Sequence, residues 1–185
     1  MIEEILDDAN IRMMKSVESM SNEFNRIRTG RASPALLDQI MIEYYGSRVP
    51  IAQAATVGIA DARTITIQAW EKQIIPVIEK AILESDLGLN PTTAGEVIRI
   101  NIPALTEERR KEMTKMVRNE GENGKIAVRN IRRDAIGDLR DLVKEGIISQ
   151  DEEKRSESRL EEITKQNISE IDKKVSTKEN EVMEV

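Results

Sequence analysis

The sequence predicts an α+β protein, in which a long antiparallel three-helix bundle carries a small inserted domain of strands and one helix. Apolar residues recur every three or four positions in two outer stretches, which is typical of helices that pack along one face. Between these stretches, β-branched and other apolar residues alternate with polar ones, as they do in strands. We therefore expect a helical bundle formed by residues 1–29 and 105–185, and an inserted domain over residues 31–104.

The first and last helices are predicted from their apolar stripes and their end signals. Residues 2–27 place apolar side chains on one helical face, and Gly30 supplies a stop because glycine readily adopts left-handed backbone angles. The last helix is predicted to begin after Ser149, since Ser149 and Glu152 have the spacing of a capping box. Its predicted apolar stripe consists of Leu160, Ile163, Ile168, Ile171, Val175 and Val182.

The inserted domain is predicted to contain several strands around one helix. The period-two pattern places strands at residues 39–45, 63–70 and 96–102, with shorter ones at 49–51 and 56–59. A helix is predicted over residues 74–85, where Pro76 is compatible only with the first turn. The pair Asn90 and Pro91 predicts a turn.

The middle helix, predicted over residues 105–144, has an apolar face beside a basic face. Its predicted core residues are Met113, Val117, Val128, Ile131, Ala135, Leu139 and Leu142. Its basic arc consists of Arg118, Lys125, Arg129, Arg132, Arg133 and Arg140. Gly121 and Gly124 each cost about 1 kcal/mol of helix propensity relative to alanine. The apolar register stays in phase across both glycines, so one continuous helix is predicted.

The basic arc is unexpected in a protein whose formal net charge is −6. Residues 125–133 contain cations but no anion. One interpretation is a surface for nucleic acid or another polyanion, and the other is a helix face that is only solvated. The segment from Gly121 to Lys125 is not a phosphate-binding loop, because it lacks the required spacing and follows no strand.

Composition argues against most catalytic chemistry. The chain has no cysteine and no histidine, which removes thiolate nucleophiles, imidazole bases and the common zinc sites. Its few aromatic residues mean that nucleic acid would be bound through phosphates and shape rather than through rows of stacked bases. We expect a monomer without enzyme activity, cofactor, metal, small-molecule substrate or membrane span. A cytoplasmic location is expected, because the N-terminus is not a secretory signal.

Motifs typical of one known family occur in order along the chain: RTGRASP at 28–34, EYYG at 43–46, ARTITIQAWEK at 62–72, IPVIEKAI at 75–82, SDLGLNP at 85–91, LTEERRKE at 105–112, VRNIRRDA at 128–135 and KENEVMEV at 178–185. Through them the chain resembles the bacterial ribosome recycling factors essentially from end to end. The resemblance implies an L-shaped protein, with the bundle as its long arm and a β/α/β sandwich as its short arm. The two glycines of the middle helix depart from the family's pattern.

The resemblance also implies a function. A factor of this family binds the post-termination ribosome and, with elongation factor G and GTP, promotes its separation into subunits, without being an enzyme itself. The implied contacts with large-subunit ribosomal RNA are led by Arg132 and Arg129, and further candidates are Arg133, Arg110, Arg28, Arg31 and, from the basic arc, Lys125. Two short crossings at 29–31 and 103–105 would form a hinge, made of Thr29, Gly30, Arg31, Pro103, Ala104 and Leu105.

Two other functions are compatible with parts of the sequence. A structural protein would use its helices to bind other helices, with the basic arc facing solvent. A hydrolase would need carboxylates such as Glu43, Asp61 and Glu96, which form no convergent pattern in the sequence.

Overall fold

The computed structural model describes residues 1–27 and 29–184. These residues form two compact units. The helical unit contains residues 1–27 and 107–184, and the mixed unit contains residues 29–106. No helix in the described part of the chain is both long and apolar enough to cross a membrane.

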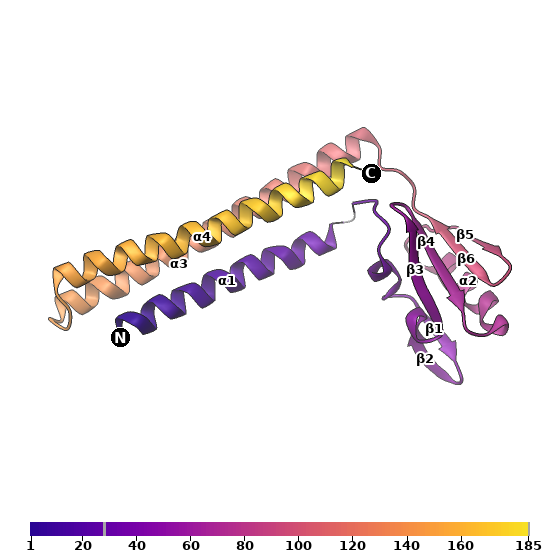
Figure 1. Ribbon diagram of the computed structural model, residues 1–185, viewed down its shortest axis with the longest axis horizontal. Helices are drawn as coiled ribbons and strands as arrows, with labels where there is room; N and C mark the ends of the chain where they lie inside the picture. The colour runs from indigo at the N-terminus through magenta and orange to yellow at the C-terminus, as the bar shows by residue number, and fades with distance from the viewer. Residues whose placement is uncertain (28, 185) are drawn as a thin grey trace. The chain divides into compact units, whose positions relative to one another are not determined.

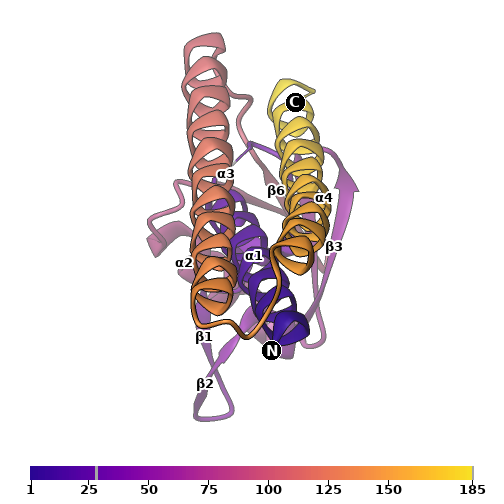
Figure 2. The ribbon, with the colours of Figure 1, turned by 90° about the vertical axis from the view of Figure 1, so that its left-hand side faces the viewer.

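The helical unit is a bundle of three helices (Figure 1). These are α1 (Ile2–Arg26), α3 (Glu107–Lys144) and α4 (Gln150–Met183). Helix α3 runs in the opposite direction to α1 and α4, and the view in Figure 2 shows the three helices around a common axis. The predicted three-helix bundle is thus confirmed. Helix α1 ends at Arg26, well before Gly30, because Ile27 already has extended backbone angles.

Helix α3 is continuous through both of its mid-helix glycines, as predicted. Gly121 and Gly124 are buried, and each lies where a neighbouring helix comes close. A Cβ atom on Gly121 would lie 2.5 Å from Cγ2 of Val175 in α4. A Cβ atom on Gly124 would lie 3.2 Å from Sδ of Met20 in α1. The two glycines therefore act as packing positions, and their low helix propensity is offset by close contact between helices.

The buried stripe of α4 differs from the predicted one, because it is partly polar. Its buried residues are Ser156, Leu160, Thr164, Asn167, Ile171 and Val182, whereas Ile163, Ile168 and Val175 are only half-buried. Thr164 Oγ1 donates to the carbonyl of Leu160 at 2.8 Å, and Asn167 Nδ2 donates to that of Ile163 at 2.9 Å. These bonds within the helix satisfy the buried polar groups. A stripe drawn through apolar residues alone therefore missed them.

The mixed unit contains a four-stranded antiparallel sheet, a two-stranded hairpin and one α-helix. The sheet has the order β3-β4-β6-β5, with β3 at Ala55–Asp61, β4 at Thr64–Ala69, β6 at Val97–Asn101 and β5 at Pro91–Ala94. The hairpin pairs β1 (Met41–Tyr44) with β2 (Ser47–Pro50), and the helix is α2 (Ile75–Glu84). In the sheet, Ile65 pairs with Ile100 and Ile67 with Ile98, so four fully buried isoleucines face one core.

Strand β5 corrects the predicted turn at Asn90 and Pro91. Proline lacks an amide N–H, so it is tolerated at the first position of an edge strand. Pro91 occupies that position in β5, which lies at the edge of the sheet. The Asn-Pro pair therefore marks the residue where the strand begins.

Candidate nucleic-acid interface

The basic arc of α3 divides into two sets of cations with different surroundings. The first set, Arg118, Lys125, Arg132 and Arg140, recurs at intervals of seven or eight residues and therefore follows one side of the helix. Each of these cations is paired with acids of α4. The partners are Glu179 for Arg118 at 2.5 Å, Asp172 for Lys125 at 2.6 Å, Glu161 for Arg132 at 2.7 Å, and Glu153 and Glu157 for Arg140 at 3.7 and 3.9 Å. The sequence pattern of α3 could not show this neutralisation, because the acids lie on another helix.

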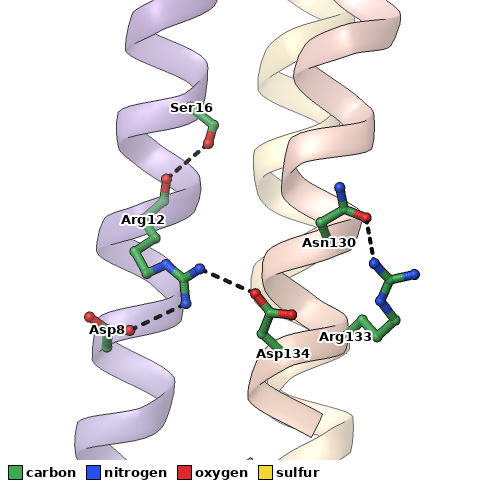
Figure 3. Close-up of polar contacts among 6 residues, drawn as sticks. All are labelled: Asp8, Arg12, Ser16, Asn130, Arg133 and Asp134. Atoms are coloured by element: carbon green, nitrogen blue, oxygen red, sulfur yellow. Dashed lines mark hydrogen bonds and ion pairs between the residues drawn. The ribbon is translucent and has the colours of Figure 1, made fainter. Parts of the chain in front are cut away.

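The second set consists of Arg129 and Arg133, which are exposed and four residues apart. Arg133 Nη2 donates to Oδ1 of Asn130 at 3.1 Å, on the side of α3 away from α1 (Figure 3). Within residues 1–27 and 29–184, neither arginine forms an ion pair with an acid. Both guanidinium groups are therefore accessible to an external anion.

Lys115 extends this accessible strip, and the sequence analysis did not single it out. It is exposed and has no ion pair among the residues that the structure describes. It precedes Arg133 by 18 residues, which is five helical turns, so the two lie on the same side of α3 about 27 Å apart. The eighteen-residue spacing could have revealed it. We refer to Lys115, Arg129 and Arg133 as the open strip.

The opposite side of α3 carries a different ion pair. Arg12 of α1 lies between Asp8 of its own helix and Asp134 of α3, with nitrogen–oxygen distances of 3.7 and 3.3 Å (Figure 3). This side is therefore neutralised within the bundle. The cations of α3 without an acidic partner among the described residues are thus those of the open strip and Arg110.

Arg132 is the least exposed arginine of the set that is paired with α4. Its side chain is 37% exposed, and Nη1 donates to Oε2 of Glu161. Lys125 is more deeply engaged, with Nζ bonded to Asp172 and lying 3.4 Å from Glu122. The hydrogen bond to Asp172 raises the pKa of Lys125 above its usual value, so its ammonium group stays charged.

Of the remaining predicted RNA contacts, Arg110 shares α3 with these residues. Arg110 lies near the start of α3, about 33 Å along the helix from Arg132. Its Nη1 donates to the carbonyl of Met183 at 3.5 Å. Arg31 is exposed and belongs to the mixed unit. Arg28 lies outside the described residues.

The residues that adjoin the two predicted hinge segments are bonded to one turn inside the mixed unit. The amide of Ala32 donates to the carbonyl of Ala62 at 2.7 Å, and the amide of Ile102 donates to that of Arg63 at 2.7 Å. Gly30 has a φ of 72°, and a Cβ atom there would lie 3.0 Å from Cγ of Leu105. The two segments thus run side by side, and residues 29–31 and 103–105 lie beyond these anchoring bonds.

Two of the acids considered for hydrolysis are engaged with neighbouring residues. Asp61 accepts hydrogen bonds from the amide of Arg63 and the hydroxyl of Thr64, and the bond from Arg63 lowers the pKa of Asp61 below its usual value. Glu96 pairs with Lys72 at 3.2 Å. Among the described residues, no group of three acids is placed to hold a metal ion.

Comparison with known proteins identifies the family. Residues 20–183 match the family described as Ribosome recycling factor. The chain is 53% identical to the ribosome-recycling factor of Thioalkalivibrio sulfidiphilus and 54% identical to that of Dichelobacter nodosus, with full coverage of both chains in each case.

Solved structures agree with this assignment. A solution structure of the ribosome recycling factor is similar, with a TM-score of 0.75 and 44% identity, over 100% of this chain and 98% of that one. A second similar structure is described as models for the T. thermophilus ribosome recycling factor and the E. coli elongation factor G bound to the E. coli post-termination complex. Its TM-score is 0.66 at 44% identity, over 98% of both chains. The chain therefore belongs to the ribosome recycling factor family.

Proposed function

We propose that this chain recycles ribosomes. It binds the post-termination ribosome in the cytoplasm and, with elongation factor G and GTP, promotes separation into subunits and release of messenger and deacylated transfer RNA. The observation that carries this proposal is the match over the whole chain to ribosome-recycling factors, one of which is described as bound to a post-termination complex with elongation factor G.

The proposed contact with large-subunit ribosomal RNA is made by the open strip together with Arg132. Arg129 and Arg133 present exposed guanidinium groups without acidic partners among the described residues, and such groups bind phosphate oxygens with two parallel hydrogen bonds. Further contacts with the ribosomal RNA are made by Arg110, Arg31 and Arg28. Lys125 contributes less than the arginines, because Asp172 and Glu122 already occupy its ammonium group.

The chain itself performs no bond chemistry under this proposal. Free energy for separating the subunits comes from the GTP that elongation factor G hydrolyses. The chain contributes a stiff helical unit that binds RNA and a second unit joined to it through two short segments.

The test of the RNA contact measures co-sedimentation of the full chain with purified bacterial large ribosomal subunits. We expect Arg129→Ala and Arg132→Ala each to weaken binding by about 1–3 kcal/mol. Each should also lower the slope of log affinity against log salt by about one, since one phosphate contact is lost. The matched control is Arg118→Ala, which removes a more exposed arginine that is paired with Glu179.

Two outcomes would count against the proposal. Unchanged affinity of both variants would exclude the assigned surface. Absence of ribosome co-sedimentation, combined with self-association of the wild type, would favour a structural helical protein instead. Subunit splitting measured with elongation factor G and GTP completes the test, because a recycling factor must accelerate it.

We also propose that Thr29, Gly30, Arg31, Pro103, Ala104 and Leu105 form a hinge that works during splitting. Gly30→Ala would place a side chain at a positive φ and against Leu105. We expect slower subunit splitting with ribosome binding retained. Gly46→Ala is the control, since Gly46 has a φ of 79° but no atom near its Cβ position. Splitting by Gly30→Ala at the wild-type rate would contradict the hinge.

A further inference from the structure

Arg132 differs from the other arginines that pair with α4. Its side chain is 37% exposed, against 68% for Arg118 and 64% for Arg140. Its Nε is buried without an acceptor among the described residues. The side chain therefore lies along the bundle surface, and its guanidinium group does not extend freely into solvent.

The carboxylate of Glu161 fixes the part of Arg132 that reaches the surface. Nη1 lies 2.7 Å from Oε2 of Glu161, which is a short charge-assisted hydrogen bond. A guanidinium group is planar, so fixing one terminal nitrogen and burying Nε largely sets the direction of the remaining N–H groups. By contrast, the guanidinium nitrogens of Arg140 lie 3.7 and 3.9 Å from Glu153 and Glu157, so these acids hold that group less tightly.

We infer that Glu161 is a positioning residue, which orients Arg132 toward a phosphate of the ribosomal RNA. The inference rests on the proposed function and assigns Glu161 a part in it. Glu161 does not touch the RNA in this arrangement. It holds the arginine in a binding-ready direction, so the loss of side-chain freedom on binding is smaller.

The inference predicts a change in RNA affinity that is opposite to the change expected from net charge alone. A carboxylate beside a polyanion repels it, so removal of Glu161 would strengthen RNA binding if only net charge mattered. If Glu161 positions Arg132, its removal weakens binding although the surface becomes more positive. Glu179 provides a matched control, because it pairs with Arg118 on the same two helices.

The experiment compares full-length Glu161→Ala, Glu161→Gln and Glu179→Ala in co-sedimentation with purified bacterial large ribosomal subunits at fixed salt. We expect Glu161→Ala to weaken binding by about three- to tenfold. Glu161→Gln keeps an oxygen acceptor, so it should lose less. Glu179→Ala should bind at least as tightly as the wild type. Far-UV circular dichroism and thermal unfolding verify that each variant is folded.

A double-mutant cycle separates positioning from a general structural effect. In the Arg132→Ala background, Glu161→Ala should cause no further weakening, because the group that it positions is absent. Equal weakening in both backgrounds would overturn the inference, as would wild-type or tighter binding by Glu161→Ala alone. If Arg132→Ala itself leaves affinity unchanged, the proposed RNA contact of Arg132 fails and the positioning role fails with it.

Discussion

The helical unit and the mixed unit fill their cores with different kinds of residue. The mixed unit has a buried apolar cluster rich in isoleucine, in which Ile65, Ile67, Ile78, Ile82, Ile98 and Ile100 are all fully buried. The core of the helical unit instead includes Gly121, Gly124, Ser156, Thr164 and Asn167. Both units bury large apolar side chains, such as Leu139 and Leu160 in the bundle, but the bundle adds close approach of helices at glycines and paired charges along its edges.

The largest expected effect comes from truncating the isoleucine core. Ile98→Ala should lower the free energy of unfolding of the mixed unit by about 2–5 kcal/mol, because it leaves a cavity in a fully buried cluster. Hydrogen exchange of amides, measured separately in the two units of the full chain, checks this value. Ile59→Ala is the control, since Ile59 is 52% exposed. An equal loss of amide protection in both units would show that Ile98 does not stabilise the mixed unit in particular.

A smaller effect is expected where α3 meets α4. Gly121→Ala should destabilise the helical unit by about 1–3 kcal/mol, because its methyl group would collide with Val175. Gly137→Ala in the same helix has no atom within 4 Å of the new Cβ. It should stabilise the protein by up to about 1 kcal/mol through helix propensity. Thermal unfolding of both variants is the measurement, and stabilisation by Gly121→Ala would show that close approach at this position is unimportant.

The smallest effect concerns the charged cap of α4. Glu152 accepts hydrogen bonds from the amide and hydroxyl of Ser149, and the bond from the amide lowers the pKa of Glu152 below its usual value of 4.5. A lowered pKa contributes stability above the unfolded value, and this contribution is lost as the pH falls through the folded value. The Ser149 amide resonance should therefore shift in acid, at a pH below 4.5. Glu152→Gln should abolish this pH dependence, and a shift that persists would assign it to another group.

Several elements could be predicted from the sequence because one physical signal dominated each of them. The apolar period of α3 located Val117, Val128 and Leu139 in the core, and period-two alternation located β4 and β6. Other features depend on tertiary contacts. The sequence of α3 alone gave no sign that Arg132 would meet Glu161, and Thr164 and Asn167 did not register as core residues because they are polar.

The candidate RNA-binding residues also divide into features that the sequence located and features that depend on tertiary contacts. The motif VRNIRRDA located Arg129 and Arg133, which the structure leaves without acidic partners in its described part. The resemblance placed Arg132 and Arg129 ahead of Arg133, whereas in the structure Arg132 differs from the other two in burial and pairing. Only the fold reveals that difference, since it depends on which residues of α4 lie opposite α3.

The contact between Gly121 and Val175 also limits how the helices can slide. Helices α3 and α4 are antiparallel, so a slip of one turn, about 5.4 Å, would bring Val175 to the level of Val117 or Lys125. Val117 and Lys125 each carry a side chain, whereas Gly121 leaves that space to a methyl group of Val175. The contact at Gly121 therefore favours this axial register of α3 and α4 over registers in which Val175 would face a residue with a side chain.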